Sequence, residues 1–316
     1  MINVMTQPIK TSISPASLRF RPGTLADSYD VYKITERALA DLSQRIGVAR
    51  PGDAPDSDAL VRAWPNHRSL YHHLAGAAEK FWIAERNGRP IGFTRSMMHE
   101  GVWELTEFFI LPGEQSTGVG RELLRRVWPA QPTRRRCIIA TIDSRAQARY
   151  LKAGLYPRFP IYYFGRTPEK TTMATDLTIE PVTASAETLA AMGELDQAIL
   201  GYRRDMHHRW FCSDRQGYLY YRDNQPVGYG YVGRWNGPFV LLDNQDFPAV
   251  LAHAESAAAA QGQAEFGMDI PMVNRAAIDY LLARNYRMGK FIVYLMSDEP
   301  FGKFENYINT SPMFFL

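Results

Sequence analysis

The stretch Phe108–Val127, FFILPGEQSTGVGRELLRRV, decides the fold of the first half of the chain. The apolar, largely aromatic run before Pro112 predicts a buried strand, and apolar residues that recur at helical spacing after Gly118 predict an amphipathic helix. The N–H groups in the first turn of a helix have no acceptor within it and lie at the positive end of its dipole. The turn Gln115–Arg121 therefore predicts a phosphate or pyrophosphate site, with a plain structural turn as the alternative.

Two known phosphate-binding motifs do not fit the glycines of this turn. A P-loop requires Gly-Lys-Ser/Thr, which does not follow, and a dinucleotide fingerprint requires a third glycine and a later acidic residue, which are missing. Gly118 and Gly120 leave the backbone open to a closely approaching ligand, because neither carries a Cβ atom.

The composition indicates a soluble globular protein with room for two domains. The chain has 316 residues and a formal net charge of +3, which is too small to indicate nucleic-acid binding by itself. Cys137 and Cys212 lack metal-ligand spacing, and the sequence has no signal pattern or membrane-spanning run. We therefore expect a cytoplasmic protein without a metal, a nucleic-acid partner or a membrane partner. The histidine clusters lack further metal ligands. We expect His67, His72 and His73 on a solvated surface, and His207 and His208 on a solvated helix or a substrate-facing loop.

Three patterns occur in the same order in both halves of the chain, which predicts a duplicated domain. Each half has a short strand ended by proline, two β-rich runs joined by a tight turn, and a helix with an Asp or Asn cap and a Gly or Asn end. The matching segments are Leu18–Pro22 and Leu177–Pro181, Phe81–Phe93 and Tyr218–Tyr229, and Asp143–Gly154 and Asn274–Asn285.

The repeat sets the expected domain boundaries. We predict an N-terminal extension at 1–16, a first domain at 17–167, a polar linker at 168–176 and a second domain at 177–316. Strands alternate with helices, but hairpins also occur, so the predicted fold class is α/β with a mixed (α+β) sheet in two tandem domains.

At the glycine-bearing turn the sequence resembles the GNAT family of acyl-CoA-dependent N-acetyltransferases. The family's pyrophosphate loop, Gln/Arg-x-x-Gly-x-Gly/Ala, matches Gln115–Gly120. Its next motif, Asn-x-x-Ala-x-x-x-Tyr-x-x-x-Gly-Phe, is matched from Asp143 to Leu155, with Asp and Leu as departures. The resemblance covers roughly residues 17–166 and implies that 17–167 is a catalytic GNAT domain.

The resemblance implies that acetyl-CoA is the acyl donor, a small-molecule amine the acceptor, and that no metal takes part. The loop would hold the donor pyrophosphate, and the strand before it would bind the pantetheine arm through its backbone. Arg121, Arg125 and the cluster Arg134–Arg136 are candidates for contact with the ribose phosphate. The residues implied in donor binding are Phe109, Ile110, Leu111, Gln115, Ser116, Thr117, Gly118, Val119, Gly120, Arg121 and Asp143.

The same resemblance suggests the groups that move protons. Tyr150 occupies the position of the family's general acid, and a phenol suits a departing thiolate. Glu104 and Glu107 are the candidate bases, and strand alternation predicts that they point to opposite faces of the sheet. We favour Glu104, where some members have a catalytic glutamate, and leave Glu107 and deprotonation through water as alternatives.

The second half repeats the fold pattern without the donor-binding residues. It has no Gly-x-Gly at the place of the loop, and Leu281 stands where the first half has Tyr150. This predicts a degenerate GNAT-like domain that has lost acetyl-CoA binding, and it leaves a homodimer open. The apolar tail 301–316 is predicted to dock near the acceptor cleft. The acceptor pocket is expected along Thr24–Ala77, which includes the loop VARPGDAPDSDA.

The leading functional hypothesis is acetyl-CoA-dependent N-acetylation of an amine, by direct attack on the bound thioester. The alternative is an acyl-CoA-binding sensor or regulatory protein without turnover.

Overall fold

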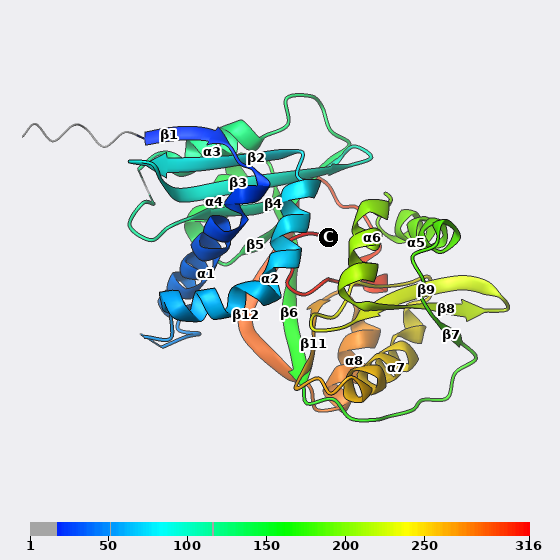
Figure 1. Cartoon of the computed structure of the whole chain (residues 1–316). Helices are drawn as coiled ribbons and strands as arrows, with labels where there is room; N and C mark the ends of the chain where they lie inside the picture. Colours follow the sequence, from blue (N-terminus) through cyan, green and yellow to red (C-terminus); the bar gives the residue numbers. More distant parts are fainter. Residues whose placement is uncertain (1–17, 51, 116) are drawn as a thin grey trace, which may run out of the picture.

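The computed structural model of the chain describes residues 18–50, 52–115 and 117–316 (Figure 1). The predicted N-terminal extension at 1–16 and Ser116 of the loop lie outside the described residues. The first half contains β1 (Leu18–Pro22), α1 (Ser28–Arg45), α2 (Ser57–Ala77), β2 (Lys80–Arg86), β3 (Arg89–His99), β4 (Val102–Ile110), α3 (Val119–Val127), β5 (Arg135–Thr141), α4 (Ser144–Lys152) and β6 (Tyr156–Arg166). The second half contains β7 (Thr178–Pro181), α5 (Ala186–Ile199), α6 (Asp205–Asp214), β8 (Gln216–Arg222), β9 (Gln225–Val232), β10 (Phe239–Leu241), α7 (Phe247–Ala260), β11 (Phe266–Pro271), α8 (Arg275–Ala283), β12 (Arg287–Ser297) and β13 (Tyr307–Ile308).

The repeat expected from the sequence is confirmed by the local structure. Each hairpin, β2–β3 and β8–β9, turns through two residues with positive φ. The side chains of Asp143 and Asn274 accept backbone N–H groups at the N-termini of α4 and α8. Beyond these helices, Gly154 and Asn285 take the left-handed conformation, with φ of 81° and 61°. Capping and turn chemistry is therefore the same in the two halves.

The two halves share one sheet because each contributes a strand to the other. The eight-stranded sheet has the order β1-β2-β3-β4-β5-β12-β6-β11. From the second half, β12 lies antiparallel between β5 and β6. From the first half, β6 lies antiparallel between β12 and β11. The segment 168–176 separates the halves along the sequence, but backbone hydrogen bonds join them in this sheet, as the adjacent β6 and β12 in Figure 1 show.

In the first half the sheet splits between β4 and β5. The two strands pair in parallel only where Val102–Glu104 lies beside Arg135–Cys137. Farther along, β4 keeps its pairing with β3 as far as Ile110, and β5 keeps its pairing with β12 as far as Thr141. The two strand ends therefore diverge and leave a cleft between them.

In the second half the corresponding place is filled by the C-terminal segment. The five-stranded sheet has the order β13-β10-β9-β8-β7. By their order in the repeat, β10 and β11 correspond to β4 and β5. β13 pairs with β10 on one side, and Asn309 forms a bridge to Asp269 of β11 on the other. Asn274 Nδ2 also donates to the carbonyl of Tyr307, at 3.2 Å. The C-terminal segment therefore occupies in the second half the space that is an open cleft in the first half.

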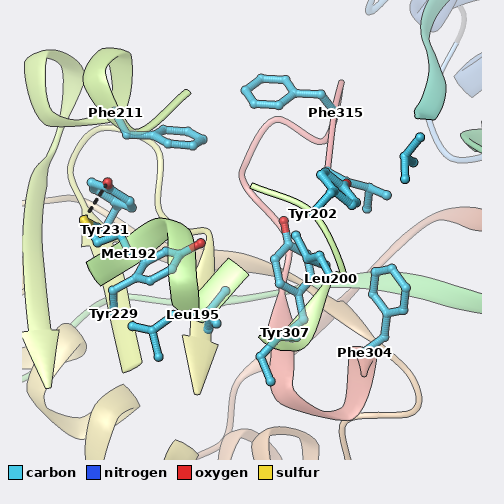
Figure 2. Packing of buried hydrophobic residues seen from close by; sticks show 14 of the residues in the cluster. Met192, Leu195, Leu200, Tyr202, Phe211, Tyr229, Tyr231, Phe304, Tyr307 and Phe315 are labelled. Atoms are coloured by element: carbon cyan, nitrogen blue, oxygen red, sulfur yellow. Dashed lines mark hydrogen bonds between the residues drawn. The ribbon is translucent and has the colours of Figure 1, made fainter. Parts of the chain in front are cut away.

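An apolar, largely aromatic cluster fills the junction of the halves. It combines Leu70 and Leu74 of α2 with Phe211 of α6 and with Phe315 and Leu316 of the tail, all buried. The rings of Phe211 and Phe315 stack at 5.8 Å between centroids. Figure 2 shows residues of this cluster, and Figure 1 marks the C-terminus between α2 and α6. The expectation that the tail docks is therefore confirmed.

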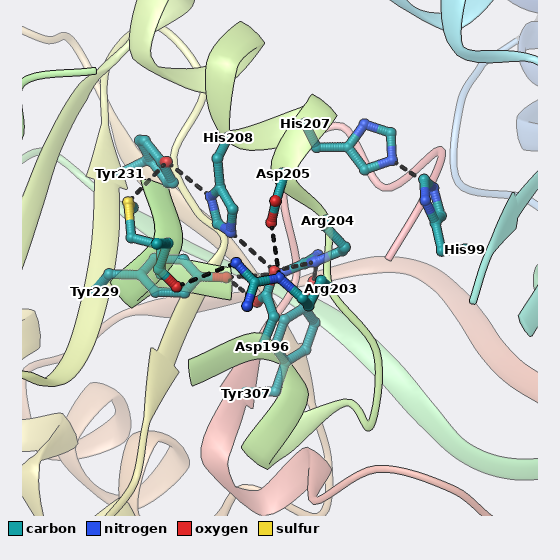
Figure 3. Close-up of polar contacts among 12 residues, drawn as sticks. His99, Asp196, Arg203, Arg204, Asp205, His207, His208, Tyr229, Tyr231 and Tyr307 are labelled. Atoms are coloured by element: carbon teal, nitrogen blue, oxygen red, sulfur yellow. Dashed lines mark hydrogen bonds and ion pairs between the residues drawn. The ribbon is translucent and has the colours of Figure 1, made fainter. Parts of the chain in front are cut away.

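A buried polar network lies beside this cluster (Figure 3). Asp196 of α5 accepts hydrogen bonds from Arg204 at 2.8 and 3.0 Å, and its Oδ2 lies 2.8 Å from His208 Nε2. Burial alone would raise the pKa of Asp196, but the charges of Arg204 and His208 and their hydrogen bonds hold it well below its usual range. The Asp196 carboxylate is therefore held charged inside the protein.

The expectation of solvated histidines at 207 and 208 is wrong. Both side chains are buried, and His207 bridges His73 of α2 and His99 of β3 through nitrogen–nitrogen distances of 2.7 and 2.9 Å. The partners lie on other elements, far away in the sequence, so the local pattern of α6 does not reveal them. These contacts fix the second half against the first.

Because β6 has neighbours only from the second half, we expect residues 1–167 expressed alone not to fold cooperatively. The fragment loses the partners of β6 and one partner of β5, so these strands expose their backbone N–H and C=O groups. Circular dichroism during urea unfolding checks this, with the full chain as reference. Co-expression with residues 168–316 is expected to restore a soluble complex. If residues 1–167 alone unfolded in urea with a cooperative transition, this would contradict the dependence of the first half on the exchanged strands.

Candidate functional site

A cavity of about 270 Å³ lies in the cleft where β4 and β5 diverge. Its walls come from α1, from Thr106–Ile110 of β4, from Ile138–Thr141 of β5 and from the start of α4. The second half contributes Phe291 and Val293 of β12 and the tail residues Pro312–Phe314. The cavity is therefore built from both halves of the chain.

The cavity opens through the sheet, because side chains from both faces line it. Phe108 packs with Tyr150 and Leu124 on the face covered by α3 and α4. Phe109 packs with Tyr32 of α1 and Tyr71 of α2 on the other face. One ligand can thus enter between α3 and α4, and a second can enter beside α1 and the tail.

A β-bulge in β4 puts Glu104 and Glu107 on the same face of the sheet. Arg95 of β3 lies opposite Glu107 and Ser96 lies opposite Leu105, so Thr106 is an extra residue. The extra residue reverses the alternation beyond it. The expectation that the two glutamates point to opposite faces is therefore wrong, because regular alternation was assumed through a bulged strand.

Glu107 lines the cavity and Glu104 does not. Glu107 Oε2 accepts a hydrogen bond from Arg95 Nη1 at 2.6 Å, and both side chains are fully buried. Glu107 Oε1 has no hydrogen-bond partner in the described part of the chain. Burial raises the pKa of Glu107, although the charge and hydrogen bond of Arg95 act against this. Glu107 is therefore a buried carboxylate beside the cavity with one oxygen left unpaired.

Arg95 is held in place by aromatic rings. Its guanidinium lies 4.2 Å from the centroid of Phe81 and 5.5 Å from that of Phe93. Such a cation–π cage stabilises a charge that has left water. The cage therefore fixes the group that positions Glu107.

Glu104 is bound to the tail. The backbone N–H of Leu316 donates to both of its carboxylate oxygens, at 3.0 and 3.2 Å. Burial raises the pKa of Glu104 to about 8, although the N–H of Leu316 and the charge of Arg204 act to lower it. Its visible role in the fold is to anchor the tail beneath the cavity wall.

Tyr150 lines the cavity from α4 and is almost completely buried. Its ring packs edge-on against Phe108 at 6.4 Å between centroids. Burial, and secondly the charge of Asp143, raise the pKa of Tyr150 above its ordinary value. The phenol is therefore protonated at neutral pH and available as a donor.

The two glycines of the loop each have a structural reason. Gly118 caps α3 with φ of 91°, where any other L-residue is strained, and a Cβ there would meet open space. A Cβ on Gly120 would come within 3.0 Å of Ile110 Cδ1 and 3.2 Å of Phe108 Cζ. Gly118 shapes the turn and Gly120 lets α3 pack on β4, so the glycines alone do not prove a ligand.

Asp143 caps α4 and pairs with two arginines. Its carboxylate accepts the backbone N–H of Arg145 at 2.9 Å and forms ion pairs with Arg45 of α1 at 2.8 Å and with Arg145 at 2.9 Å. Burial acts to raise the pKa of Asp143, but hydrogen bonds from Arg145 and Arg45 outweigh it and hold the pKa far below its usual range. The charge added by Asp is therefore neutralised within the site.

A second, more open hollow adjoins the cavity between α3 and α4, and Arg145 and Arg149 line both. It is rich in cations and has two tryptophans in its wall, Trp82 and Trp128. Its basic residues are Lys80, Arg121, Arg125, Arg126, Arg145, Arg149 and Lys152. Arg134–Arg136 line neither hollow. A long anionic ligand can run from this basic surface into the cavity.

The cavity brings together only some of the residues expected at the site. Those that line it are Glu107, Phe109, Ile110, Gln115, Gly120, Asp143 and Tyr150. The others do not line it: Glu104 is buried behind it, Val119 is buried in the core, Arg121 faces the second hollow, and Leu111, Thr117 and Gly118 lie outside. Leu39, Leu42 and Arg45 line the cavity and fall within Thr24–Ala77, where the acceptor pocket was expected. The described residues of the loop VARPGDAPDSDA do not line it.

Sequence reasoning missed the wall residues of β12 and the two arginines of α4. Arg145 and Arg149 are four positions apart, which puts them on one helix face, so this signal was available. Phe291 and Val293 lie about 170 residues after the loop in the sequence and reach the cavity through the strand exchange. No local sequence pattern indicates this strand exchange.

Residues 77–159 match the family model of the acetyltransferase (GNAT) domain. This segment is a GNAT-type acyltransferase domain. The matched segment runs from the end of α2 to the first part of β6 and contains the loop, both glutamates and Tyr150. No curated protein matches the sequence.

Solved structures share the fold over nearly the whole chain. A protein from Pyrococcus horikoshii, provisionally described as an acetyltransferase, is 16% identical with a TM-score of 0.67, covering 96% of this chain and 97% of that one. A GCN5-related N-acetyltransferase from Sphaerobacter thermophilus is 14% identical with a TM-score of 0.56, covering 89% and 95%. A tandem GNAT protein from the clavulanic acid biosynthesis pathway is 13% identical with a TM-score of 0.56, covering 90% and 99%. The expected α/β fold with tandem GNAT-like domains is therefore confirmed.

The described residues contain neither a membrane-spanning helix nor a cluster of metal ligands. None of their helices has both the length and the apolar character needed to cross a bilayer. No group of three or more His, Cys, Asp or Glu side chains among them is arranged to hold a metal ion.

Glu104 makes the stability of the protein depend on pH. The folded state keeps the proton up to about pH 8, whereas an unperturbed glutamate releases it near 4.5. The stabilisation is thus fully present below about pH 4.5 and is lost as the pH rises to about 8, by at most about 1.4 kcal/mol per pH unit. Glu104→Gln keeps an acceptor for Leu316 and should flatten this part of the curve, as measured by urea unfolding between pH 5 and 9. Equal slopes for the two proteins would contradict the assignment.

Proposed function

We propose that the protein transfers an acetyl group from acetyl-CoA to the amine of a small molecule, by direct attack of the amine on the bound thioester. The observation that carries this proposal is the arrangement of the cavity. Glu107, which keeps one carboxylate oxygen without a hydrogen bond, and Tyr150 line one cleft, which opens to a basic surface on one side of the sheet.

The basic surface supports a donor that carries several phosphates. The first-turn N–H groups of Val119–Arg121 have no acceptor within α3, because the helix bonding begins where Glu122 N–H donates to the carbonyl of Gly118, at 3.2 Å. Helix N-termini of this kind bind pyrophosphate, and arginines strengthen such contacts by charge-assisted hydrogen bonds. The pyrophosphate would lie at α3, the remaining phosphate along the hollow, and the pantetheine arm along β4.

The reaction needs one proton to leave the amine and one to reach the sulfur. A protonated acceptor first loses one proton to solvent. Glu107 Oε1 then accepts the second proton from the nitrogen as the nitrogen forms a bond to the carbonyl carbon. The carbon–sulfur bond breaks, and Tyr150 gives its proton to the departing thiolate. Exchange with solvent then returns a proton to Tyr150 and removes one from Glu107, so the enzyme is regenerated.

The raised pKa of each group supports its role. A glutamate with a raised pKa is a better base than a solvated one, and its carboxylate form is preserved by Arg95. A tyrosine with a raised pKa stays protonated until a strongly basic thiolate forms. We therefore assign the base to Glu107 instead of Glu104, which the tail covers.

Two features of the second half argue against a second donor site there. β13 occupies the place between β10 and β11, and Leu281 replaces the tyrosine and is fully buried. We propose that this half, with residues 177–316, supports the fold and the acceptor side of the first half's cavity. In this proposal 17–167 carries the catalytic groups, 168–176 is the linker, and the protein acts in the cytoplasm.

Acetyl-CoA is expected to bind the full chain in isothermal titration calorimetry. Arg149→Ala should weaken binding about tenfold, since a lost charge-assisted contact costs about 1.5 kcal/mol or more. Arg135→Ala removes the same charge outside both hollows and is the matched control. Equal affinities of the two variants would contradict the donor route, and binding without turnover of any amine would favour the sensor.

Glu107→Gln and Tyr150→Phe are each expected to lower kcat by about 100-fold or more with little change in acetyl-CoA affinity. Each change removes the proton-transferring function and keeps the shape of the side chain. Thiol release measured with an amine panel checks this. Glu104→Gln is the matched control on the same strand and the same face, and a larger loss of kcat in it than in Glu107→Gln would reverse the assignment.

A further inference from the structure

The acceptor side of the cavity has mostly apolar walls, with Arg45 of α1 and Thr106 of β4 as polar exceptions. Leu39 and Leu42 of α1, Phe109 of β4, Phe291 of β12 and Met313 and Phe314 of the tail line it. All are apolar, so an acceptor body that fills this side gains by leaving water.

The free carboxylate groups of this cavity suffice to pair with a single ammonium group. In the described part of the chain its carboxylates are Glu107 and Asp143. Asp143 already pairs with Arg45 and Arg145, whereas Glu107 keeps one oxygen without a partner. A second ammonium on the acceptor would find no free carboxylate here, and a carboxylate beside the amine would lie against Glu107.

The tail is a fixed wall because it is tied down on both sides of Phe314. Before it, Arg215 donates to Thr310 Oγ1 at 3.0 Å and to the carbonyl of Ser311 at 3.2 Å. After it, the N–H of Leu316 is bound by Glu104. The ring of Phe314 packs edge-on against Tyr71 at 6.2 Å and Phe109 at 6.5 Å. This wall keeps its position while the acceptor binds.

We propose that the acceptor is a primary amine on an aliphatic or aromatic body, with no second ammonium and no carboxylate beside the amine, and that Phe314 of the second half sets the size of that body. The proposal rests on the acyl transfer proposed above and adds the substrate class. It makes Phe314 a specificity-determining residue contributed by the half that lacks the proton-transfer groups.

Two matched pairs of amines test the class with the wild-type chain. 2-Phenylethylamine and phenylalanine differ by a carboxylate, and hexylamine and 1,6-diaminohexane differ by a second ammonium. We expect kcat/KM from thiol release to be at least tenfold higher for the first member of each pair. Preference for the second member of either pair would overturn the class, whereas absence of both acetyl-CoA binding and turnover would instead refute the proposed function.

Phe314→Ala tests the size limit. It should shift the ratio of kcat/KM for a bulky amine, such as 4-phenylbutylamine, to that for 2-phenylethylamine by about tenfold toward the bulky one. Phe20→Ala is the matched control, because this half-buried ring of β1 lies outside the cavity, beside Arg126. If Phe314→Ala does not fold, Phe314→Leu gives the same comparison with a smaller change in volume. An unchanged ratio in the folded Phe314 variant would overturn the role of this residue.

Discussion

The structure depends on the insertion of β12 between β5 and β6. Without it, β5 would have only its short parallel contact with β4, and the main sheet would end where the cavity begins. Backbone hydrogen bonds along this strand hold β5 in place while β4 bends away. The cleft therefore stays open because one of its edges is supported from the other half of the chain. The same strand provides Phe291 and Val293 to the cavity wall, so support and lining come from one element.

The C-terminal segment has opposite effects on the two equivalent openings. In the second half, Tyr307–Ile308 and Asn309 fill the space between β10 and β11 with paired backbone. In the first half, the next residues reach only the rim of the cleft and narrow it, with Leu316 bound to Glu104. A single segment thus closes one opening and shapes the other, so the two similar folds present different openings to a ligand.

Local features of the fold could be predicted from the sequence, whereas features that depend on distant partners could not. The hairpin turns and the caps at Asp143 and Asn274 follow from residues next to one another, so the repeat was recognisable. The bulge at Thr106 has no glycine or proline to mark it, and it puts Glu107 on the same face of the sheet as Glu104. The burial of His207 depends on His73 and His99, which lie more than 100 residues away. Tyr150, which lines the cavity, could be identified as a candidate site residue because its helix motif is continuous in the sequence.

The cage around Arg95 has a consequence for how such a site can change over time. Glu107 is positioned by a cation that lies among the rings of Phe81 and Phe93, on strands of the first half only. The wall at Phe314 belongs to the tail, and the tail meets this cage at Tyr71, whose ring lies 5.9 Å from the Arg95 guanidinium and packs against Phe314. A mutation in the tail that alters which molecules fit can therefore also disturb the packing around Arg95. The cavity wall and the cage are encoded by separate parts of the gene, yet they share this contact, so the two cannot change independently.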